Sequence, residues 1–192
     1  MTTEAKTQSI KCQNQLLQVR FGWHGDRYKH CVEARYSRDS DWQVIAESIE
    51  GSDREIWPSS PPFQQVESHI GGTGRSCLLA VGLAGGSHWS ASIEEIVDEP
   101  EAGIARIRFD VACRIKAGGG SLGSTYRSDR MERSVTDPAI VQLSDQIQVR
   151  LEAAEESRSS VLDGIFSVSP LSIPDGGPAT ARWQYDFVVE GV

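Results

Sequence analysis

The stretch that decides the fold is LQVRFGWHGDRYKHCVEARY, residues 17–36. Its apolar residues recur at every second position, first from Val19 to Trp23 and then from Tyr28 to Tyr36. A period of two is typical of β-strands that turn one face to a core and the other to water. The stretch therefore predicts two half-buried strands.

Gly25 and Asp26 lie where these two strands meet, and they predict a two-residue turn of type II′. Such a turn sets the cross-strand pairs Trp23 with Tyr28, Phe21 with His30 and Val19 with Val32. A slip of one residue would turn every apolar side chain to the wrong face. Because the turn and the alternation agree on one register, we expect a β-hairpin.

Alternation continues in residues 102–116 and 181–191, which predict two more strands with one apolar face each. Residues 44–50 and 77–83 also predict strands, and the second is apolar on both faces, as in a strand at the centre of a sheet. Residues 145–158 alternate at first and then contain helix formers, so we expect a strand that frays into a turn.

The connecting segments are rich in proline, glycine, serine or charge and predict loops: residues 51–68, 97–103, 127–138 and 169–180. Within the first, Ser60 before two prolines predicts one short helical turn through Val66. About eight to ten short strands at this spacing predict an all-β, mainly antiparallel protein with at most one or two short helices. We expect a β-sandwich, with a flattened β-barrel as the alternative.

The composition sets further limits. The chain has 192 residues, 39% hydrophobic and 24% charged, which is typical of a soluble globular protein with a single domain over residues 1–192. We expect residues 1–9 to be a flexible N-terminal tail. The net charge of −8 and the pI of about 5.0 disfavour nucleic acid and anionic membranes as partners. With no signal-peptide run and no stretch of about 20 apolar residues, we expect a cytoplasmic protein.

Metal and disulfide motifs are missing. The four cysteines are far apart and form no C-x-x-C pair: Cys12, Cys31, Cys77 and Cys113. We expect free, partly buried thiols, with two disulfides as the alternative if the protein is exported. His24 and His30 fall on opposite faces of the first hairpin and His69 falls in a predicted loop. We therefore predict no metal site and no cofactor, and a hydrogen-bonded core position for His30.

The stretch GLAGGSHWSASIEE, residues 82–95, predicts a second hairpin closed by Gly85 and Gly86. Its register pairs Trp89 with Gly82, Ala91 with Ala80 and Ile93 with Leu78 on the apolar face. The other face collects His88, Ser90, Ser92 and Glu94 beside Leu83, Val81, Leu79 and Cys77. Polar groups against an apolar floor are typical of ligand sites, but a solvated strand face would look the same.

The same stretch argues against a serine hydrolase. His88, Ser90 and Glu94 stand along one strand with about 6.6 Å between neighbours on a face, so a catalytic triad within this strand has poor geometry. Two glycine-rich segments are also poor candidates for nucleotide-binding or phosphate-binding motifs. Residues 117–123 match G-x-G-x-x-G but follow a strand with charged outward positions, and they predict a hairpin loop before a short strand over residues 122–127. Residues 71–77 lack the spacing of a phosphate loop.

Two further residues are candidates for binding. Trp57 lies in a long proline-rich connection, where aromatic side chains stack on ligands or else plug the end of a sandwich core. Arg20 lies on the wet face of the first hairpin. We predict a non-catalytic binding module for a small ligand or a protein partner, with candidate ligand-binding residues His88, Ser90, Glu94, Trp57 and Arg20. The alternatives are a hydrolase-type enzyme that uses His88 with a carboxylate from elsewhere, and a structural subunit that forms a homo-oligomer through an exposed strand edge.

Overall fold

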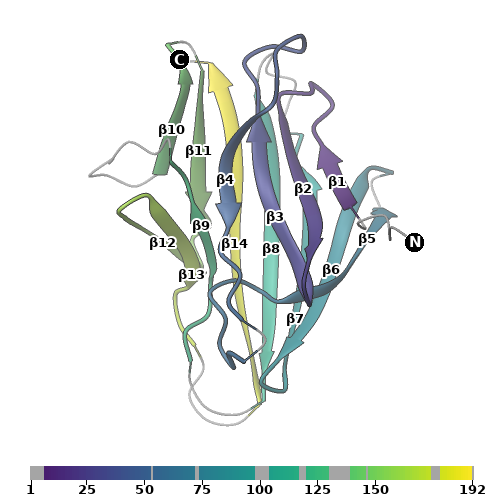
Figure 1. Ribbon diagram of the computed structural model, residues 1–192, viewed down its shortest axis with the longest axis vertical. Coiled ribbons are helices and arrows are strands. Elements are labelled where there is room, and N and C mark those ends of the chain that lie inside the picture. The colour runs from purple at the N-terminus through teal and green to yellow at the C-terminus, as the bar shows by residue number, and fades with distance from the viewer. Residues whose placement is uncertain are drawn as a thin grey trace.

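The computed structural model describes residues 7–52, 54–71, 74–97, 104–116, 120–129, 139–145, 147–173 and 178–191. These residues form fourteen strands and no helix. The strands build two seven-stranded antiparallel sheets that pack face to face and do not join into one closed sheet (Figure 1). The predicted all-β sandwich is therefore confirmed, with more strands than we expected.

Sheet A, nearer to the viewer in Figure 1, has the order β1-β2-β3-β4-β9-β13-β12. Its strands are β1 (Thr7–Lys11), β2 (Leu17–His24), β3 (Arg27–Ala34), β4 (Gln43–Ser48), β9 (Ser124–Arg127), β12 (Ser157–Leu162) and β13 (Ile165–Pro170). Sheet B has the order β10-β11-β14-β8-β7-β6-β5. Its strands are β5 (Phe63–Ile70), β6 (Ser76–Ala84), β7 (Ser87–Glu95), β8 (Ala105–Ile115), β10 (Ala139–Ser144), β11 (Ile147–Ala153) and β14 (Ala179–Gly191).

Both predicted hairpins form with the predicted registers. In β2–β3, Trp23 faces Tyr28 and Phe21 faces His30 across the turn. In β6–β7, Gly85 and Gly86 both have positive φ, as a two-residue type I′ turn requires. The outward and inward faces of these four strands are therefore the ones that the alternation predicts.

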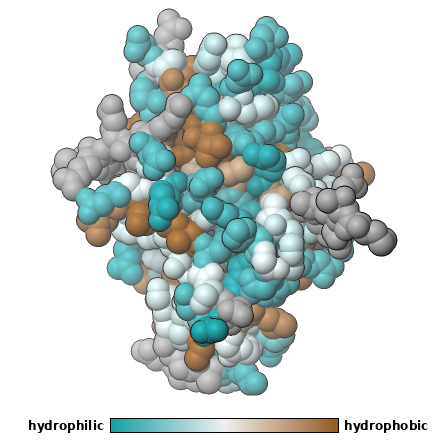
Figure 2. Space-filling model, in the orientation of Figure 1, coloured by the Kyte–Doolittle hydropathy of each residue, from teal (hydrophilic) through white to brown (hydrophobic). Residues whose placement is uncertain are grey.

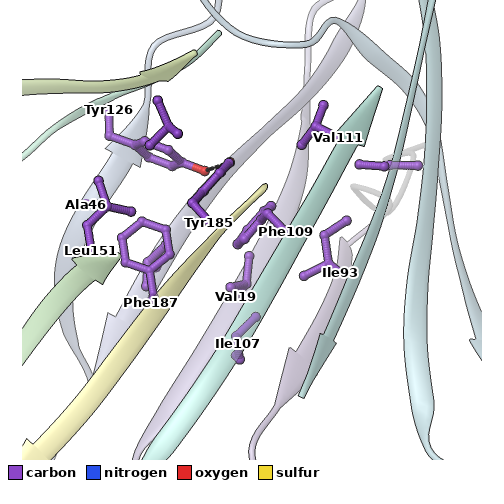
Figure 3. Packing of buried hydrophobic residues seen from close by; sticks show 14 of the residues in the cluster. Val19, Ala46, Ile93, Ile107, Phe109, Val111, Tyr126, Leu151, Tyr185 and Phe187 are labelled. Carbon is purple, nitrogen blue, oxygen red and sulfur yellow. Dashed lines mark hydrogen bonds between the residues drawn. The ribbon is translucent and has the colours of Figure 1, made fainter. Parts of the chain in front are cut away.

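The core lies between the sheets and is built from their inward side chains (Figure 3). Large aromatic rings fill its centre: Phe109 stacks on Tyr185 with ring centroids 5.0 Å apart, and Tyr126 stacks on Phe166 at 5.2 Å. His30 is buried there, and its Nε2 is 2.9 Å from the Tyr126 hydroxyl. The expected hydrogen-bonded core histidine is confirmed.

The predicted helical turn over residues 60–66 is wrong. The Ser60 hydroxyl instead donates to the carbonyl oxygen of Thr125 and accepts from its N–H, each at 3.0 Å. This contact ties the proline segment to β9, and the chain enters β5 at Phe63. His69, which we expected in a loop, lies in β5.

Three other predictions are corrected. Residues 7–9, expected in a flexible tail, begin β1 and pair with β2. Residues 77–83 form β6, which is apolar on both faces but lies next to the edge strand β5 rather than at the centre of the sheet. The predicted hairpin between residues 102–116 and residues 122–127 is wrong, because β8 and β9 belong to different sheets.

Other predictions on the loops and thiols have mixed outcomes. All four cysteines are free. Residues 147–153 form β11 and then turn into β12, as the mixed pattern predicts. Residues 1–6 of the predicted tail lie outside the described residues, as do parts of the predicted loops: residues 53, 98–103, 117–119, 130–138 and 174–177. A search of the described residues for a helix able to span a membrane finds none.

Candidate functional site

The outward side chains of β6, β7, β8 and β14 stand in rows, because the strand registers continue across sheet B. One row contains Val81, Ser90, Ala112 and Arg182. The neighbouring row contains Leu83, His88, Arg114 and Thr180. The middle of the first row carries only the small side chains of Ser90 and Ala112, so the surface is lowest there.

This low point is a hollow of about 510 Å³, which we call the Ala112 hollow. Ser90 and Ala112 form its floor, and His88 and Arg114 form the wall at one end. Val81 and Leu83 line one side. The hollow is open to solvent and lies on the outer face of the sandwich, so a ligand can enter it without any opening of the core.

The apolar side of the hollow comes from β6. Its outward side chains are unusually exposed for aliphatic residues, with Val81 at 47% and Leu83 at 52%. The inward face of the same strand is buried in the core through Leu78 and Ala80. The double apolar pattern of residues 77–83 therefore reflects a core face and an exposed strip, and exposed aliphatic strips of this kind often mark binding surfaces.

Gln64 closes the hollow at the edge strand. At an irregularity in the β5–β6 pairing, its side-chain amide accepts from the Leu83 N–H at 2.7 Å and donates to the Leu83 carbonyl at 3.1 Å. The two strands approach so closely that a Cβ on Gly82 would lie 1.9 Å from the Pro62 carbonyl oxygen. Only glycine fits here, and the close approach holds Gln64 beside the apolar strip.

Arg114 supplies the charge at this site. Its guanidinium is exposed and makes no ion pair within the described part of the chain. Two other outward arginines of the same strand differ: Arg106 and Arg108 both bind the carboxylate of Asp186. Arg114 therefore offers a free guanidinium fork, which is suited to a carboxylate or another oxyanion.

The structure brings only part of the predicted site together. His88 and Ser90 line the Ala112 hollow. Glu94 shares their strand and face but lies opposite Cys77 and Arg108, three same-face steps from His88, a distance of about 20 Å. It does not take part in the hollow.

Trp57 and Arg20 lie elsewhere. Trp57 is partly buried in the connection between β4 and β5, where its ring packs edge-on against Trp89 at 6.2 Å and covers Gly120. It plugs the core, which was the alternative to a ligand-stacking role. Arg20 lies on the outer face of sheet A, and its Nη2 is 2.6 Å from the Glu33 carboxylate. Neither residue lines the hollow on sheet B.

The described residues do not assemble a catalytic triad around His88. Its cross-strand neighbours are Leu83 and Arg114, and neither is a carboxylate that could orient the imidazole. Ser90 is the next residue on the same face, and both side chains project from the sheet. No cluster of three or more metal-ligating side chains occurs among the described residues.

Sequence reasoning missed Arg114, Ala112, Gln64 and Thr180 as members of the hollow. The alternation in β8 already turned Arg114 outward, but no tight turn links β7 to β8 and sets their register. Gln64 fell in the segment that we expected to be helical. Comparison of the protein with known protein families, with curated proteins and with solved structures finds no match.

Proposed function

We propose that this protein is a binding module that holds a small organic acid in the Ala112 hollow. The observation that carries the proposal is the Arg114 guanidinium, which has no ion-pair partner among the described residues and lies at the end of an exposed aliphatic strip. The acid group would lie against Arg114 and His88, and its hydrocarbon part would cover Val81 and Leu83.

Two contributions to the binding free energy favour such a ligand. Each Å² of apolar surface that the ligand covers contributes about 25 cal/mol, and Val81 and Leu83 are both about half exposed. A charge-assisted, bidentate hydrogen bond from Arg114 would add specificity for the acid. Because the chain carries a net charge of −8, the attraction for an anion is local to this guanidinium and not a property of the whole surface.

The test is isothermal titration calorimetry with hexanoate and with hexan-1-ol, which share a hydrocarbon chain and differ in charge. We expect hexanoate to bind more tightly than hexan-1-ol. Arg114→Gln should weaken hexanoate binding about tenfold, the effect of roughly one charge-assisted hydrogen bond, and leave hexan-1-ol unchanged. Ala112→Leu should fill the floor of the hollow and remove binding of both probes.

Arg127→Gln is the matched control, because Arg127 is an exposed arginine on the outer face of sheet A, remote from the Ala112 hollow. Its hexanoate affinity should equal that of the wild type. Failure of hexanoate to bind, or binding that survives Ala112→Leu, would rule out this hollow as the site.

A further inference from the structure

A second hollow of about 510 Å³ lies on the opposite side of the sandwich, on the outer face of sheet A. Figure 2 views this face, with hydrophobic side chains gathered on the left half, where β12 and β13 lie. The hollow is built from segments far apart in sequence: the connection before β5, residues 121–123, and strands β9, β12 and β13. It does not overlap the Ala112 hollow.

Short side chains explain why the surface is low here. Thr125, Ser167 and Ser160 form one outward row across β9, β13 and β12, and Ser169 lies opposite Arg158 in the next. Gly123 continues the floor, and a Cβ there would lie 2.8 Å from the Val168 carbonyl oxygen. We call this site the Arg158 hollow.

The lining is rich in hydroxyl groups. Thr125 donates its hydroxyl to the Ser59 carbonyl at 2.8 Å, and the Ser167 hydroxyl lies 2.9 Å from that of Ser160. The hydroxyls of three other lining residues, Ser59, Ser121 and Ser169, make no hydrogen bond to a described residue. Several donors are therefore free to turn toward one bound group.

Arg158 is the one charged residue among the described residues that line this hollow. Its side chain is exposed and forms no ion pair within the described ranges. A guanidinium surrounded by hydroxyl donors, with no carboxylate among the described lining residues, is suited to a group with several terminal oxygens. A carboxylate has two such oxygens, and a bidentate guanidinium contacts both of them, whereas a phosphate or sulfate ester has a third terminal oxygen that the hydroxyls can bind.

We infer that the Arg158 hollow is a second binding site, which takes the phosphate or sulfate group of a small organic ester. Arg158 holds two of the terminal oxygens, and the hydroxyls of Ser169 and Ser121 hold the third. The exposed side chain of Leu171 and the partly buried Ile173 form an apolar rim that receives the organic part of the ester. The sandwich thus binds two different anions on opposite faces.

The experiment is a titration of the whole protein with phenyl phosphate, phenyl sulfate, inorganic phosphate and phenol, followed by calorimetry. We expect both esters to bind, inorganic phosphate to bind more weakly because it lacks the apolar part, and phenol not to bind. Arg158→Gln should weaken the esters at least tenfold. The difference in affinity between phenyl phosphate and phenyl sulfate identifies which of the two anions the hollow prefers.

Two variants keep this test separate from that of the proposed function. Arg127→Gln removes an exposed arginine from the same outer face and should bind the esters as the wild type does. Arg114→Gln removes the guanidinium of the other hollow, so the ester binding that remains in this variant belongs to the Arg158 hollow. Equal losses in Arg158→Gln and Arg127→Gln would show nonspecific attraction and overturn the inference. Loss in Arg114→Gln alone would place the esters in the Ala112 hollow, and no ester binding at all would also reject this site.

Discussion

Asp186 on the outer face of sheet B and Glu50 between the sheets are both removed from water, yet their surroundings differ completely. Asp186 is 5% exposed and accepts hydrogen bonds from Arg106 at 2.8 Å and from Arg108 at 2.9 and 3.0 Å. The Glu50 side chain is 9% exposed, and neither of its oxygens has a hydrogen-bond partner among the described residues. Two arginines form ion pairs with Asp186, whereas no described arginine or lysine forms one with Glu50.

Asp186 belongs to a network of ion pairs that covers apolar surface on the outer face of sheet B. Arg106 also binds Glu152, and Arg150 bridges Glu152 and Glu190, so the ion pairs continue across three strands. Val188 lies below them between Arg106 and Arg150 and is only 1% exposed, although the alternation of β14 turns it outward. The aliphatic stems of the paired arginines thus cover apolar surface.

The surroundings of Glu50 disfavour its charged form. Burial raises the pKa of Glu50 to about 7, and the nearby Ser48 hydroxyl, Arg27 and Lys29 offset this only in part. Glu50 Oε1 lies 3.9 Å from Nδ1 of His30, whose pKa burial lowers to about 3. From His30 the polar groups continue through Tyr126 to the Tyr185 hydroxyl, 2.7 Å further on (Figure 3). Burial in the core disfavours the charged forms of Glu50 and His30, whereas the charged groups on the outer face of sheet B form ion pairs.

The largest expected effect comes from breaking the paired region. Asp186→Asn should lower the free energy of unfolding by about 2–4 kcal/mol, because it removes a carboxylate that neutralises two arginines. The lower part of the range is expected because Arg106 keeps Glu152 and both arginine side chains are partly exposed. Urea denaturation at pH 7 measures this loss.

Asp110→Asn is the control for that measurement. Asp110 lies on the neighbouring strand β8, on the same outer face of sheet B as Asp186, is less buried, and has no ion pair among the described residues. Its replacement should change the free energy of unfolding by no more than about 0.5 kcal/mol. If the two variants were equally stable, the ion pairs of Asp186 would contribute nothing beyond ordinary surface charge.

A smaller effect, dependent on pH, is expected in the core. The pKa of Glu50 is about 7 in the folded state against 4.5 in the unfolded state, so the folded state keeps a proton that the unfolded state loses. The stabilisation from Glu50 is complete below pH 4.5 and is lost as the pH rises to about 7. His30 acts in the opposite sense, since its stabilisation is lost as the pH falls from 6.5 to about 3.

Glu50→Gln isolates the contribution of Glu50 to the pH dependence of stability. Its free energy of unfolding, relative to the wild type, should rise by roughly 1–3 kcal/mol between pH 4.5 and pH 7 and stay level outside this window. Glu47→Gln, three residues earlier with its side chain 54% exposed, should show no such rise. A level difference for Glu50→Gln across the whole range would mean that this carboxyl titrates alike in both states.

The parts of this structure that follow local rules were predictable from the sequence. The pairs Phe21 with His30 and Trp89 with Gly82 depend only on alternation and a two-residue turn, and both are confirmed. The strand face that carries His88 and Ser90 follows from the same rule. These features need no knowledge of which strands become neighbours.

The rest depends on contacts between distant segments. Arg114 becomes part of the Ala112 hollow only through the β7–β8 register, which no short turn determines. The apolar residues of β6 suggested a strand buried on both faces, but the outer face of sheet B is open to solvent at this strand, so Val81 and Leu83 are exposed. Nothing in the local pattern around Glu50 signals a buried carboxylate, because the groups that bury it come from other strands.

The smallest effect compares paired and unpaired arginines on one strand. Arg108→Gln breaks the bidentate contact to Asp186 and should cost about 1 kcal/mol, whereas Arg114→Gln removes an exposed guanidinium without a described ion partner and should change stability by less than about 0.5 kcal/mol. Raising the salt concentration should narrow the gap, because partly exposed charges are screened. Thermal denaturation at low and high salt measures both values. An equal loss in both variants would mean that Arg114 supports the fold, and it would then be unavailable as the ligand-binding cation of the Ala112 hollow.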